Sequence, residues 1–525
     1  MKIALLIDGS SVARWQAEGI ERLGRQFDLL VYNCTNARPA PRRLRHFAYY
    51  ALNLISIRSR ITGRMPFPPH LTSRWIDFEC DQDGAWQSLP AAVVDGIASE
   101  RPIAIVKFGM GLLRVPDASR LSVPILSYHH GDPRAYRGRP AGFYETLHGR
   151  EVLGQVVQIL SDRLDAGRVV AFAETRIHSH SYRATMRDAY AVSPLILQRA
   201  IRAAAEGQSL DLVPEGSNYR LPGLGSVLRF TARLADAKVR RLVYGALFEK
   251  EWQVAEAPLR SDMLQLLQSF PPPAEWRTID RPRRYRFLAD PFPHPAGGVL
   301  VEALRSSTGL GEILHITSQS SRVLLDGRHY SYPAPLTAGG ENYLVPELTD
   351  WSSPRVFRLG QDAVHDAAPL DIPGRPRLLD PTPFQSGGRI YLFANLLSEG
   401  SSILRLWVGS SILDPFTEHP DSPIRLSPAG SRMGGAIIER AGQLYRVGQD
   451  FRGDYGNGIL LFRIDELSPA SYRETLVAEF RFDDRSGPHT LNLTGDTALF
   501  DYYRQRFSLT AGLRRMRARL SRQMG

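Results

Sequence analysis

The chain has 525 residues, more than one ordinary domain holds, so we expect two or three domains. Hydrophobic residues make up 43% and charged residues 23%, values of a folded globular protein that exclude a disordered chain, a collagen-like fibre and a disulfide-rich miniprotein. The 65 basic residues exceed the 54 acidic ones by 11, which indicates an anionic partner: nucleic acid, a lipid surface or a phosphorylated substrate.

The sequence gives no sign of secretion or of a membrane anchor. Cys34 and Cys80 cannot make a disulfide framework or a metal cluster, and they fit a reducing compartment. Asp8 interrupts the N-terminal apolar run too early for a signal peptide, and no stretch approaches the roughly 20 apolar residues of a spanning helix. We therefore expect a soluble, cytoplasmic protein that at most contacts the inner face of a membrane.

The first 175 residues alternate apolar strands with a helical pattern, which is typical of a parallel α/β sheet. A helix is expected over residues 12–23. The runs that we assign to strands are residues 2–8, 28–33, 103–106, 123–127, 156–160 and 169–173. Residues 1–175 are therefore interpreted as a Rossmann-like α/β domain.

Residues 176–246 lack this alternation. Apolar residues at helical spacing predict two long helices, over 181–206 and 226–249. We interpret the segment as a helical connector, for which plain packing is the simplest role.

Residues 247–505 contain five copies of one pattern, three clear and two weaker. Each copy has a strand, a two-residue turn with Gly and an apolar strand. The turns are expected at 297–298, 339–340, 387–388, 441–442 and 495–496. This spacing is typical of propeller blades, so we expect an all-β five-bladed propeller, closed by a strand near Trp252.

Residues 506–525 are a basic tail in which Arg514, Arg515 and further arginines are interleaved with apolar residues. A frayed terminal helix, or an amphipathic helix that binds anionic lipid or substrate, fits this pattern. Much of the positive charge lies in this tail and between Arg38 and Arg64, outside both candidate sites described below. That placement favours a membrane or another polyanionic surface near the substrate.

Polar residues collect where two strands of the first domain end. His129, His130 and Asp132 follow one strand, and Asp162 and Asp165 follow another. Functional loops lie beyond the carboxyl ends of parallel strands, so a His and a carboxylate can form an acid–base pair here. An ordinary hydrogen-bonded loop histidine explains the same residues.

These residues resemble the signature of the folate-dependent formyltransferases, which include the methionyl-tRNA, glycinamide ribonucleotide and sugar-nucleotide N-formyltransferases. That signature is Asn-x-His, a short loop, Arg-Gly and a later Leu-Asp-x-Gly turn. Here it reads Ser127-Tyr128-His129, Arg137-Gly138 and Leu164-Asp165-Ala166-Gly167. The glycine-containing segment 103–113 also resembles the family, and the resemblance covers residues 1–175.

The resemblance implies formyl transfer from 10-formyltetrahydrofolate to an amine. It implies that His129 donates to the formyl oxygen, and that Asp165 orients His129 and helps to remove the amine proton. The implied folate contacts are Gly109, Leu112, Leu164 and Gly167. Ser127 stands where the family has its catalytic Asn, so a hydroxyl is the third implied catalytic group. A site rearranged around His130, or a different reaction, would also account for Ser127.

The repeat region resembles the N-terminal domain of plant glucosamine inositolphosphorylceramide transferase and, more distantly, the family 43 glycosidases. The matching segments include 289–292, 345–347, 379–381 and 487–490. Asp290, Glu347 and Asp380 could form a carboxylate cluster that faces a sugar. No Glu stands at 433–435, where the family's acid is expected, so turn capping, sugar binding without hydrolysis and glycosidase activity all stay open.

The leading hypothesis is an N-formyltransferase acting on an amino sugar or sugar nucleotide, with the propeller holding a phosphorylated or nucleotide-linked glycan. The alternatives are a carbohydrate-active propeller enzyme (glycosidase or glycosyltransferase) and a non-catalytic glycan- or lipid-binding protein with a degenerate formyltransferase domain. We expect no metal site. Nucleic-acid binding is not expected either, because the arginines are dispersed and no recognition helix is visible.

Overall fold

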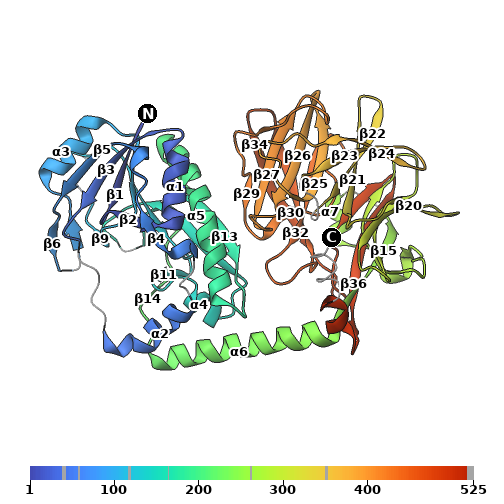
Figure 1. Ribbon diagram of the computed structural model, residues 1–525, viewed down its shortest axis with the longest axis horizontal. Coiled ribbons are helices and arrows are strands. Elements are labelled where there is room, and N and C mark those ends of the chain that lie inside the picture. Colours follow the sequence, from blue (N-terminus) through green and yellow to red (C-terminus); the bar gives the residue numbers. More distant parts are fainter. Residues whose placement is uncertain are drawn as a thin grey trace. The chain divides into compact units, whose positions relative to one another are not determined.

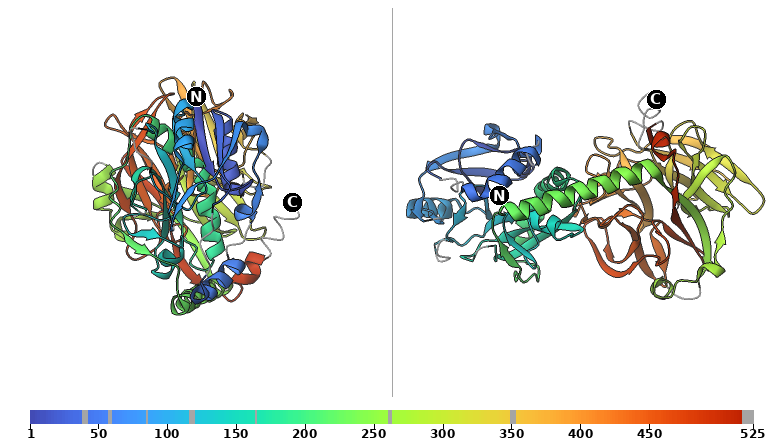
Figure 2. Two further views of the ribbon diagram at one scale, coloured as in Figure 1. Left: turned by 90° about the vertical axis from the view of Figure 1, so that its left-hand side faces the viewer. Right: turned by 90° about the horizontal axis from the view of Figure 1, so that it is seen from below.

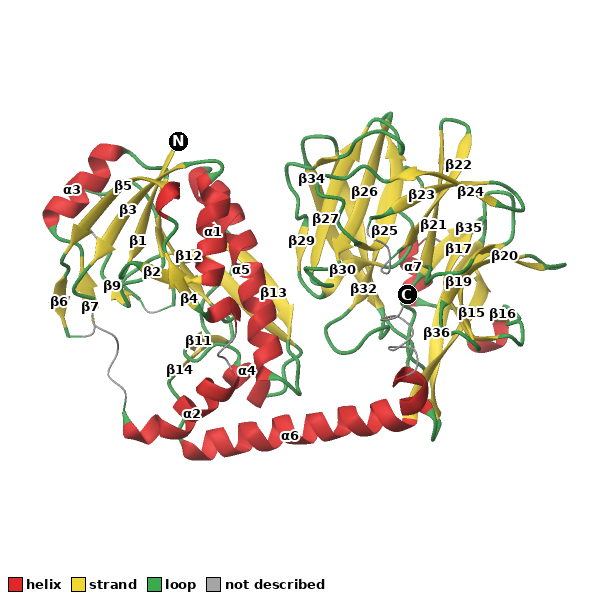
Figure 3. Cartoon of the chain, in the orientation of Figure 1, coloured by secondary structure: helices red, strands yellow, loops and turns green. Residues whose placement is uncertain are grey.

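The computed structural model describes residues 1–37, 43–56, 60–84, 86–115, 120–163, 165–259, 263–348 and 353–516. The chain divides into two compact units, Met1–Val239 and Arg240–Gly525. The first unit is built of helices and one large sheet, and the second mostly of smaller sheets (Figures 1 and 3). Within the described ranges, no helix is both long and apolar enough to cross a membrane.

A seven-stranded sheet forms the centre of the first unit, in the order β13-β12-β10-β8-β1-β3-β5. Its strands are β1 (Lys2–Ile7), β3 (Asp28–Cys34), β5 (Thr72–Phe78), β8 (Ala104–Lys107), β10 (Ile125–His129), β12 (Val152–Ile159) and β13 (Arg168–Arg176). The five strands from β10 to β5 are parallel, whereas β12 is antiparallel to both of its neighbours. All six expected strands are present; β5 was not predicted, and the sheet is mixed rather than wholly parallel.

Helices cover both faces of this sheet. α3 (Ala91–Glu100) packs Val94 and Ile97 into the same core as Leu6 and Leu30. α1 (Arg14–Gly24) and α5 (Tyr182–Ala205) contact each other on the other side, where α5 lies along β12 and β13 (Figure 1). Because α5 is a layer of the first unit, that unit continues well past residue 175, where we placed the domain boundary.

α6 (Leu224–Leu247) is one long helix, which the right-hand view of Figure 2 shows from the side. It contains the boundary between the units. α5 and α6 confirm the two predicted helices. The shorter elements of the first unit are β2 (Ser11–Ala13), α2 (Phe47–Ser56), β4 (Arg64–Pro66), β6 (Asp81–Asp83), β7 (Trp86–Ser88), β9 (Leu112–Leu113), β11 (Tyr136–Gly138), α4 (Phe143–Leu147), β14 (Ser217–Tyr219) and three 3-10 turns (Leu44–His46, Arg60–Thr62, Pro69–Leu71).

Five sheets follow one another in the second unit, each built on a path of four strands. The first two are β17 (Tyr285–Pro293), β18 (Val299–Arg305), β19 (Gly311–Ile316), β20 (Ser321–Leu325), and β21 (Ser331–Ala338), β22 (Glu341–Glu347), β23 (Arg355–Leu359), β24 (Val364–Pro369). The next two are β25 (Leu378–Ser386), β26 (Arg389–Leu396), β27 (Ile403–Gly409), β28 (Thr417–Glu418) with β29 (Arg425–Leu426), and β30 (Ala429–Met433), β32 (Gln443–Asp450), β33 (Ile459–Leu467), β34 (Tyr472–Phe480) with β31 (Ile438–Arg440).

The fifth sheet joins the two ends of the second unit. It combines β35 (Leu491–Thr494) and β36 (Thr497–Phe507) with β15 (Phe248–Pro258) and β16 (Arg277–Thr278). β15 pairs with β36 over its whole length, so the predicted strand near Trp252 is present; that it closes a propeller stays a prediction. A short helix, α7 (Met263–Gln268), and a 3-10 turn (Pro273–Glu275) lie between β15 and β16.

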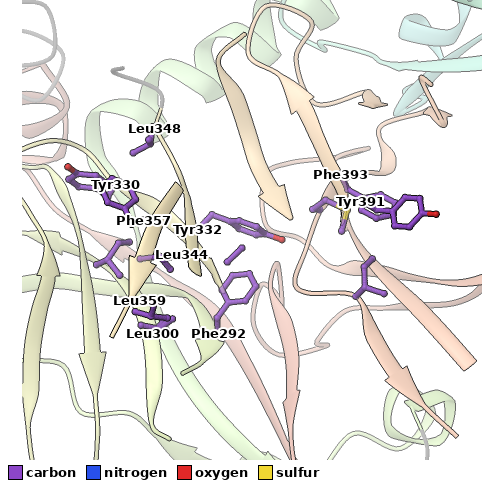
Figure 4. Packing of buried hydrophobic residues seen from close by; sticks show 14 of the residues in the cluster. Phe292, Leu300, Tyr330, Tyr332, Leu344, Leu348, Phe357, Leu359, Tyr391 and Phe393 are labelled. Atoms are coloured by element: carbon purple, nitrogen blue, oxygen red, sulfur yellow. The ribbon is translucent and has the colours of Figure 1, made fainter. Parts of the chain in front are cut away.

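All five predicted turns join two paired strands of one sheet. Four of them have two residues as predicted, whereas the connection at 297–298 is longer, because β17 ends at Pro293 and β18 begins at Val299. The first strands of consecutive sheets contact one another, β17 with β21, β21 with β25 and β25 with β30. Aromatic residues pack between them (Figure 4): Phe292 lies edge-on to Tyr332 at 4.9 Å between ring centres. The Tyr332 hydroxyl hydrogen-bonds Thr382 and Gly435, so it links three sheets.

Candidate functional site

His129 and Asp165 lie together at the carboxyl edge of the first sheet. His129 is the last residue of β10, and Asp165 lies in the connection between β12 and β13. The Nδ1 atom of His129 is 3.4 Å from Oδ1 of Asp165, and only 7% of the His129 side chain is exposed. Its Nε2 atom donates to the carbonyl oxygen of Tyr136 at 2.9 Å. The ring is therefore fixed between a carbonyl and a carboxylate.

Two glycines of the signature hold Asp165 in place. The backbone N–H of Gly138 donates to Oδ2 of Asp165 at 2.9 Å. The N–H of Gly167 donates to Gln158, and a Cβ on Gly167 would lie 2.1 Å from the carbonyl oxygen of Ile159. Only glycine fits that close approach. The Arg-Gly and Asp-x-Gly parts of the signature thus position one carboxylate.

Ser127 lies two residues before His129, so both side chains share one face of β10. Ser127 is buried, and its hydroxyl makes no hydrogen bond with any residue that the structure describes. Lys107, the last residue of β8, pairs with Ser127 in the parallel ladder. Burial lowers the pKa of Lys107 to about 8, an effect that the carboxylates of Asp8 and Asp165 partly offset. The sequence reading missed Lys107, whose signal is a lysine that ends an otherwise apolar strand.

The residues implied as folate contacts differ in how the structure places them. Gly109 is buried so closely against Asp8 that a Cβ would lie 2.6 Å from the Asp8 backbone nitrogen. Leu112 begins β9 and is half-buried, and Leu164 lies outside the described residues. A cavity on the Tyr136 side of His129 measures only about 10 Å³, too little for a pterin ring. The roles of Gly109, Leu112, Leu164 and Gly167 stay predictions.

His130 faces away from the His129–Asp165 pair. Its Nε2 atom lies 2.9 Å from Oγ of Ser193 on α5, and its ring stacks on Tyr128. Burial, followed by the neighbouring His129, lowers the pKa of His130 to about 3, so the ring is neutral. His130 is therefore part of the packing beneath α5, a position that does not favour a site rearranged around it.

A second candidate site is a cavity of about 700 Å³ in the second unit, which Asp290, Glu347 and Asp380 all line. Asp290 on β17 and Asp380 on β25 have positive φ, +49° and +46°, where the register of each strand shifts. Glu347 ends β22, and its Oε2 accepts the N–H of Asp380 at 3.0 Å. The three carboxylates predicted from the repeats thus share one cavity; their role is a prediction.

His489 is held between two carboxylates beside this cavity. Its Nε2 is 3.0 Å from Oδ1 of Asp290, and its Nδ1 is 2.7 Å from Oδ2 of Asp501. Burial disfavours the charged ring, but the two carboxylates outweigh burial and raise the pKa of His489 to about 10. The donor atoms of the three residues all lie within 4.8 Å of one another, so the group could alternatively hold a metal ion.

Arg432 and two glutamates complete the polar lining. The Arg432 guanidinium contacts Asp380 and, at 3.2 Å, Oε2 of Glu347. Burial raises the pKa of Glu347 to about 8 in spite of this pairing, and burial also holds the pKa of Glu302 well above its ordinary value. Sequence reading missed Arg432 because nothing in its repeat distinguishes it. His489 could have been found, since it lies in segment 487–490, one of the segments that resemble the plant transferase domain.

The same cavity carries many basic side chains: Lys250, Arg281, Arg283, Arg286, Arg506, Arg514 and Arg515. Arg283 and Arg286 form no ion pair with another described residue. The expectation that the tail arginines lie outside both candidate sites is therefore wrong for Arg514 and Arg515. The remaining tail arginines, beyond residue 516, lie outside the described part of the chain.

Comparison with known proteins gives a family match in the second unit. Residues 315–492 match the family model described as "Glucosamine inositolphosphorylceramide transferase 1, N-terminal". The chain is 30% identical over 208 residues to the protein of that name from Oryza sativa subsp. japonica. That alignment covers 36% of this chain and 28% of the rice protein's length, so well under two thirds of the relative is represented.

Two solved structures have a partial similarity to the chain. Glycinamide ribonucleotide transformylase 1 from Symbiobacterium toebii is 21% identical, with 39% of this chain and 88% of that chain covered and a TM-score of 0.27. The N-formyltransferase from Helicobacter canadensis, in complex with folinic acid and dTDP-3-aminofucose, is 9% identical, with 46% and 81% covered and a TM-score of 0.29. TM-scores this low do not establish a shared fold.

Proposed function

We propose that the protein is an N-formyltransferase that uses 10-formyltetrahydrofolate to formylate the amine of an amino sugar or sugar nucleotide. One observation carries this proposal: His129 and Asp165 meet at 3.4 Å on the carboxyl edge of parallel strands, where α/β proteins bind their ligands. The two residues are also those to which the formyltransferase resemblance assigns the chemistry. The buried hydroxyl of Ser127 beside them, without a described partner, fits a small carbonyl group.

10-Formyltetrahydrofolate, when bound, supplies an activated formyl group. In the transfer a bond forms between the acceptor nitrogen and the formyl carbon, and the bond from that carbon to N10 breaks. One proton leaves the acceptor amine and one is added to N10, so protons balance. Both ring nitrogens of His129 are engaged in the free protein, so its Nε2–H must exchange the Tyr136 carbonyl for the formyl oxygen as negative charge develops there. The Asp165 carboxylate holds the ring at Nδ1 and accepts the amine proton.

We further propose that the five sheets of the second unit are the blades of a five-bladed propeller, and that its cavity holds the carbohydrate. The order of the sheets and the fifth sheet, built from both ends of the unit, support this arrangement. The name of the matching family refers to a glucosamine transferase, which supports a sugar ligand. Arg283 and Arg286, which have no ion pair within the described ranges, suit a phosphorylated or nucleotide-linked sugar.

The direct test incubates the pure protein with 10-formyltetrahydrofolate and a panel of amino-sugar nucleotides and follows N-formyl product by mass spectrometry. We expect product from the wild type and a loss of at least about a hundredfold in kcat for His129→Ala, the cost typical of one lost oxyanion donor. His70→Ala, a change at an exposed histidine, is the matched control and should leave the rate unchanged. Absence of transfer to every acceptor would refute the proposal.

A second candidate function is carbohydrate chemistry in the cavity itself. Its specific support is a pair of carboxyl groups with divergent pKa values: burial raises the pKa of Glu347, whereas His489 overcomes burial and lowers the pKa of Asp290. One protonated acid and one carboxylate are what glycosidic bond cleavage requires. If this site is the active one, Asp290→Asn and Glu347→Gln abolish turnover while His129→Ala leaves it intact.

We propose a cytoplasmic location with peripheral attachment to an anionic membrane. Four large apolar side chains at the start of the α2 region and on α2 are exposed: Leu44, Phe47, Leu54 and Ile55. Arginines at 43 and 45 flank them, a combination typical of interfacial helices. Flotation with anionic but not with neutral vesicles, lost in the Phe47→Ser/Leu54→Ser variant, is the expected result.

A further inference from the structure

Lys107 is a cation beside the candidate catalytic pair that has no ion-pair partner among the described residues. It ends β8, its register partner on β10 is Ser127, and its partner on β1 is Leu6. Residues paired in neighbouring strands point to the same face of a sheet, so the Lys107 side chain shares a face with Ser127 and with His129. It is half-buried, and it makes no hydrogen bond or ion pair with any residue in the described ranges.

Two carboxylates, Asp8 and Asp165, are the charged groups that act on Lys107. Neither lies within ion-pair distance of the Lys107 ammonium among the described residues, and each makes another contact. Oδ2 of Asp8 accepts the N–H of Met110 at 3.2 Å, while Asp165 accepts from Gly138 and faces His129. An unpaired ammonium in a half-buried position costs free energy. Such a group is retained where a ligand completes its coordination.

We propose that Lys107 and the small Ser127 together replace the amide that the formyltransferase signature places at position 127, with the Lys107 ammonium donating to the formyl oxygen. This inference rests on the proposed formyl transfer. Serine is shorter than asparagine, so it leaves room on the shared face for a longer side chain from the next strand. A lysine there carries a full positive charge, which stabilises a developing oxyanion more strongly than a neutral amide does.

The ammonium acts without giving up its proton. It donates to the formyl oxygen while the acceptor nitrogen attacks, and it keeps the donor bond until the bond to N10 has broken and the carbonyl has re-formed. The group must therefore be protonated to act. With a pKa of about 8, Lys107 is mostly charged at pH 7, and its contribution declines as the pH rises through 8.

The first test is a set of four variants assayed for formyl transfer. Lys107→Met should lower kcat at least about a hundredfold with little change in KM for the donor, and Lys107→Arg should retain part of the rate because it keeps the charge. Lys238→Met makes the same change on the exposed surface of α6 and should have no effect. Ser127→Asn in the Lys107→Met background restores an amide donor and should recover at least tenfold.

A second test measures the chemical reactivity of the Lys107 amine and does not depend on turnover. Acetylation by dilute acetic anhydride at a series of pH values, followed by peptide mass spectrometry, should show Lys107 becoming reactive near pH 8, well below Lys238. Folinic acid, a formyl folate with its formyl group on N5, should protect Lys107 and leave Lys238 unprotected.

The outcomes separate the two proposals. A wild type that transfers formyl groups while Lys107→Met keeps full kcat overturns the role of Lys107 alone. A wild type that transfers nothing overturns the proposed function, and labelling then decides on the lysine: no protection by folinic acid overturns its role as a ligand donor.

Discussion

His489 is a buried histidine that the second unit keeps charged. Asp290 and Asp501 flank the two ring nitrogens, and each carboxylate also accepts backbone or hydroxyl donors from the neighbouring strands. The charge is thus part of a network that fastens β17 to β35 and β36. An interior charge of this kind makes the stability of a fold depend on pH.

We predict that the second unit loses stability as the pH rises above neutrality. Because the pKa of His489 rises from its ordinary 6.5 to about 10 in the folded protein, its contribution is complete below pH 6.5 and is lost as the pH passes through 10. Between pH 7 and 9, one retained proton changes the free energy of unfolding by about −1.4 kcal/mol per pH unit. Urea titrations of wild type and His489→Gln should differ by this slope.

His365→Gln is the control, because His365 is an exposed histidine of the same unit. Its urea midpoints should follow the wild type at every pH. Parallel curves for wild type and His489→Gln would contradict a charged His489.

At the scale of elements, Gly435 shows how closely neighbouring sheets approach. Its φ is +146°, and a Cβ would lie 2.3 Å from the carbonyl oxygen of Leu491 in the fifth sheet. Its N–H donates to the Tyr332 hydroxyl at 2.9 Å. Three sheets therefore meet at one residue without a side chain.

We predict that Gly435→Ala destabilises the second unit by about 3 kcal/mol or more, because backbone strain and a backbone collision add. Gly388→Ala isolates the strain: its φ is +71°, and a Cβ there meets nothing within 4 Å. That variant should cost only about 1–2 kcal/mol. Equal urea midpoints for the two variants would rule out the collision.

The repeats made the second unit largely predictable at this scale. A hairpin turn with positive φ favours Gly, so the sequence located all five turns, and the equivalent places of Asp290 and Asp380 in two repeats made them site candidates. Contacts between sheets carry no such local signal, which is why Arg432 and Asp501 were missed. In the first unit, β5 has the sequence TSRWIDF, and Phe78 is its only fully buried residue. The segment therefore has no continuous apolar run from which a buried strand could be predicted. Helical spacing revealed α5, but spacing does not show what a helix packs against.

For the whole molecule, part of the surplus of 11 positive charges is concentrated around the cavity of the second unit. Eight lysine and arginine residues, Arg432 among them, line the cavity that also holds Asp290, Glu347 and Asp380. An anionic ligand is attracted to such a cavity in a salt-dependent way, whereas the carboxylates of Asp380 and Asp290 are paired with Arg432 and His489. The sign of the net charge can be read from the amino-acid composition, but the positions of these side chains around one cavity follow only from the fold.

We predict that the second unit depends on β15 for solubility. A fragment of residues 240–525 should be monomeric in size-exclusion chromatography and unfold cooperatively. A fragment of residues 279–525 lacks β15, so β36 becomes an open edge along eleven residues, and aggregation follows. A monomeric shorter fragment with an unchanged melting temperature would show that β15 is dispensable.

The pairing of Phe248 with Phe507 has a practical consequence. Cα atoms opposite each other in antiparallel strands lie about 5 Å apart. The points where the chain enters and leaves the sheets of the second unit are therefore adjacent. The second unit is therefore suited to insertion into a surface loop of a host protein. Its two adjacent chain ends would join the two ends of the host loop without moving them apart. The basic cavity could in this way be transplanted whole, as a recognition module on an unrelated scaffold.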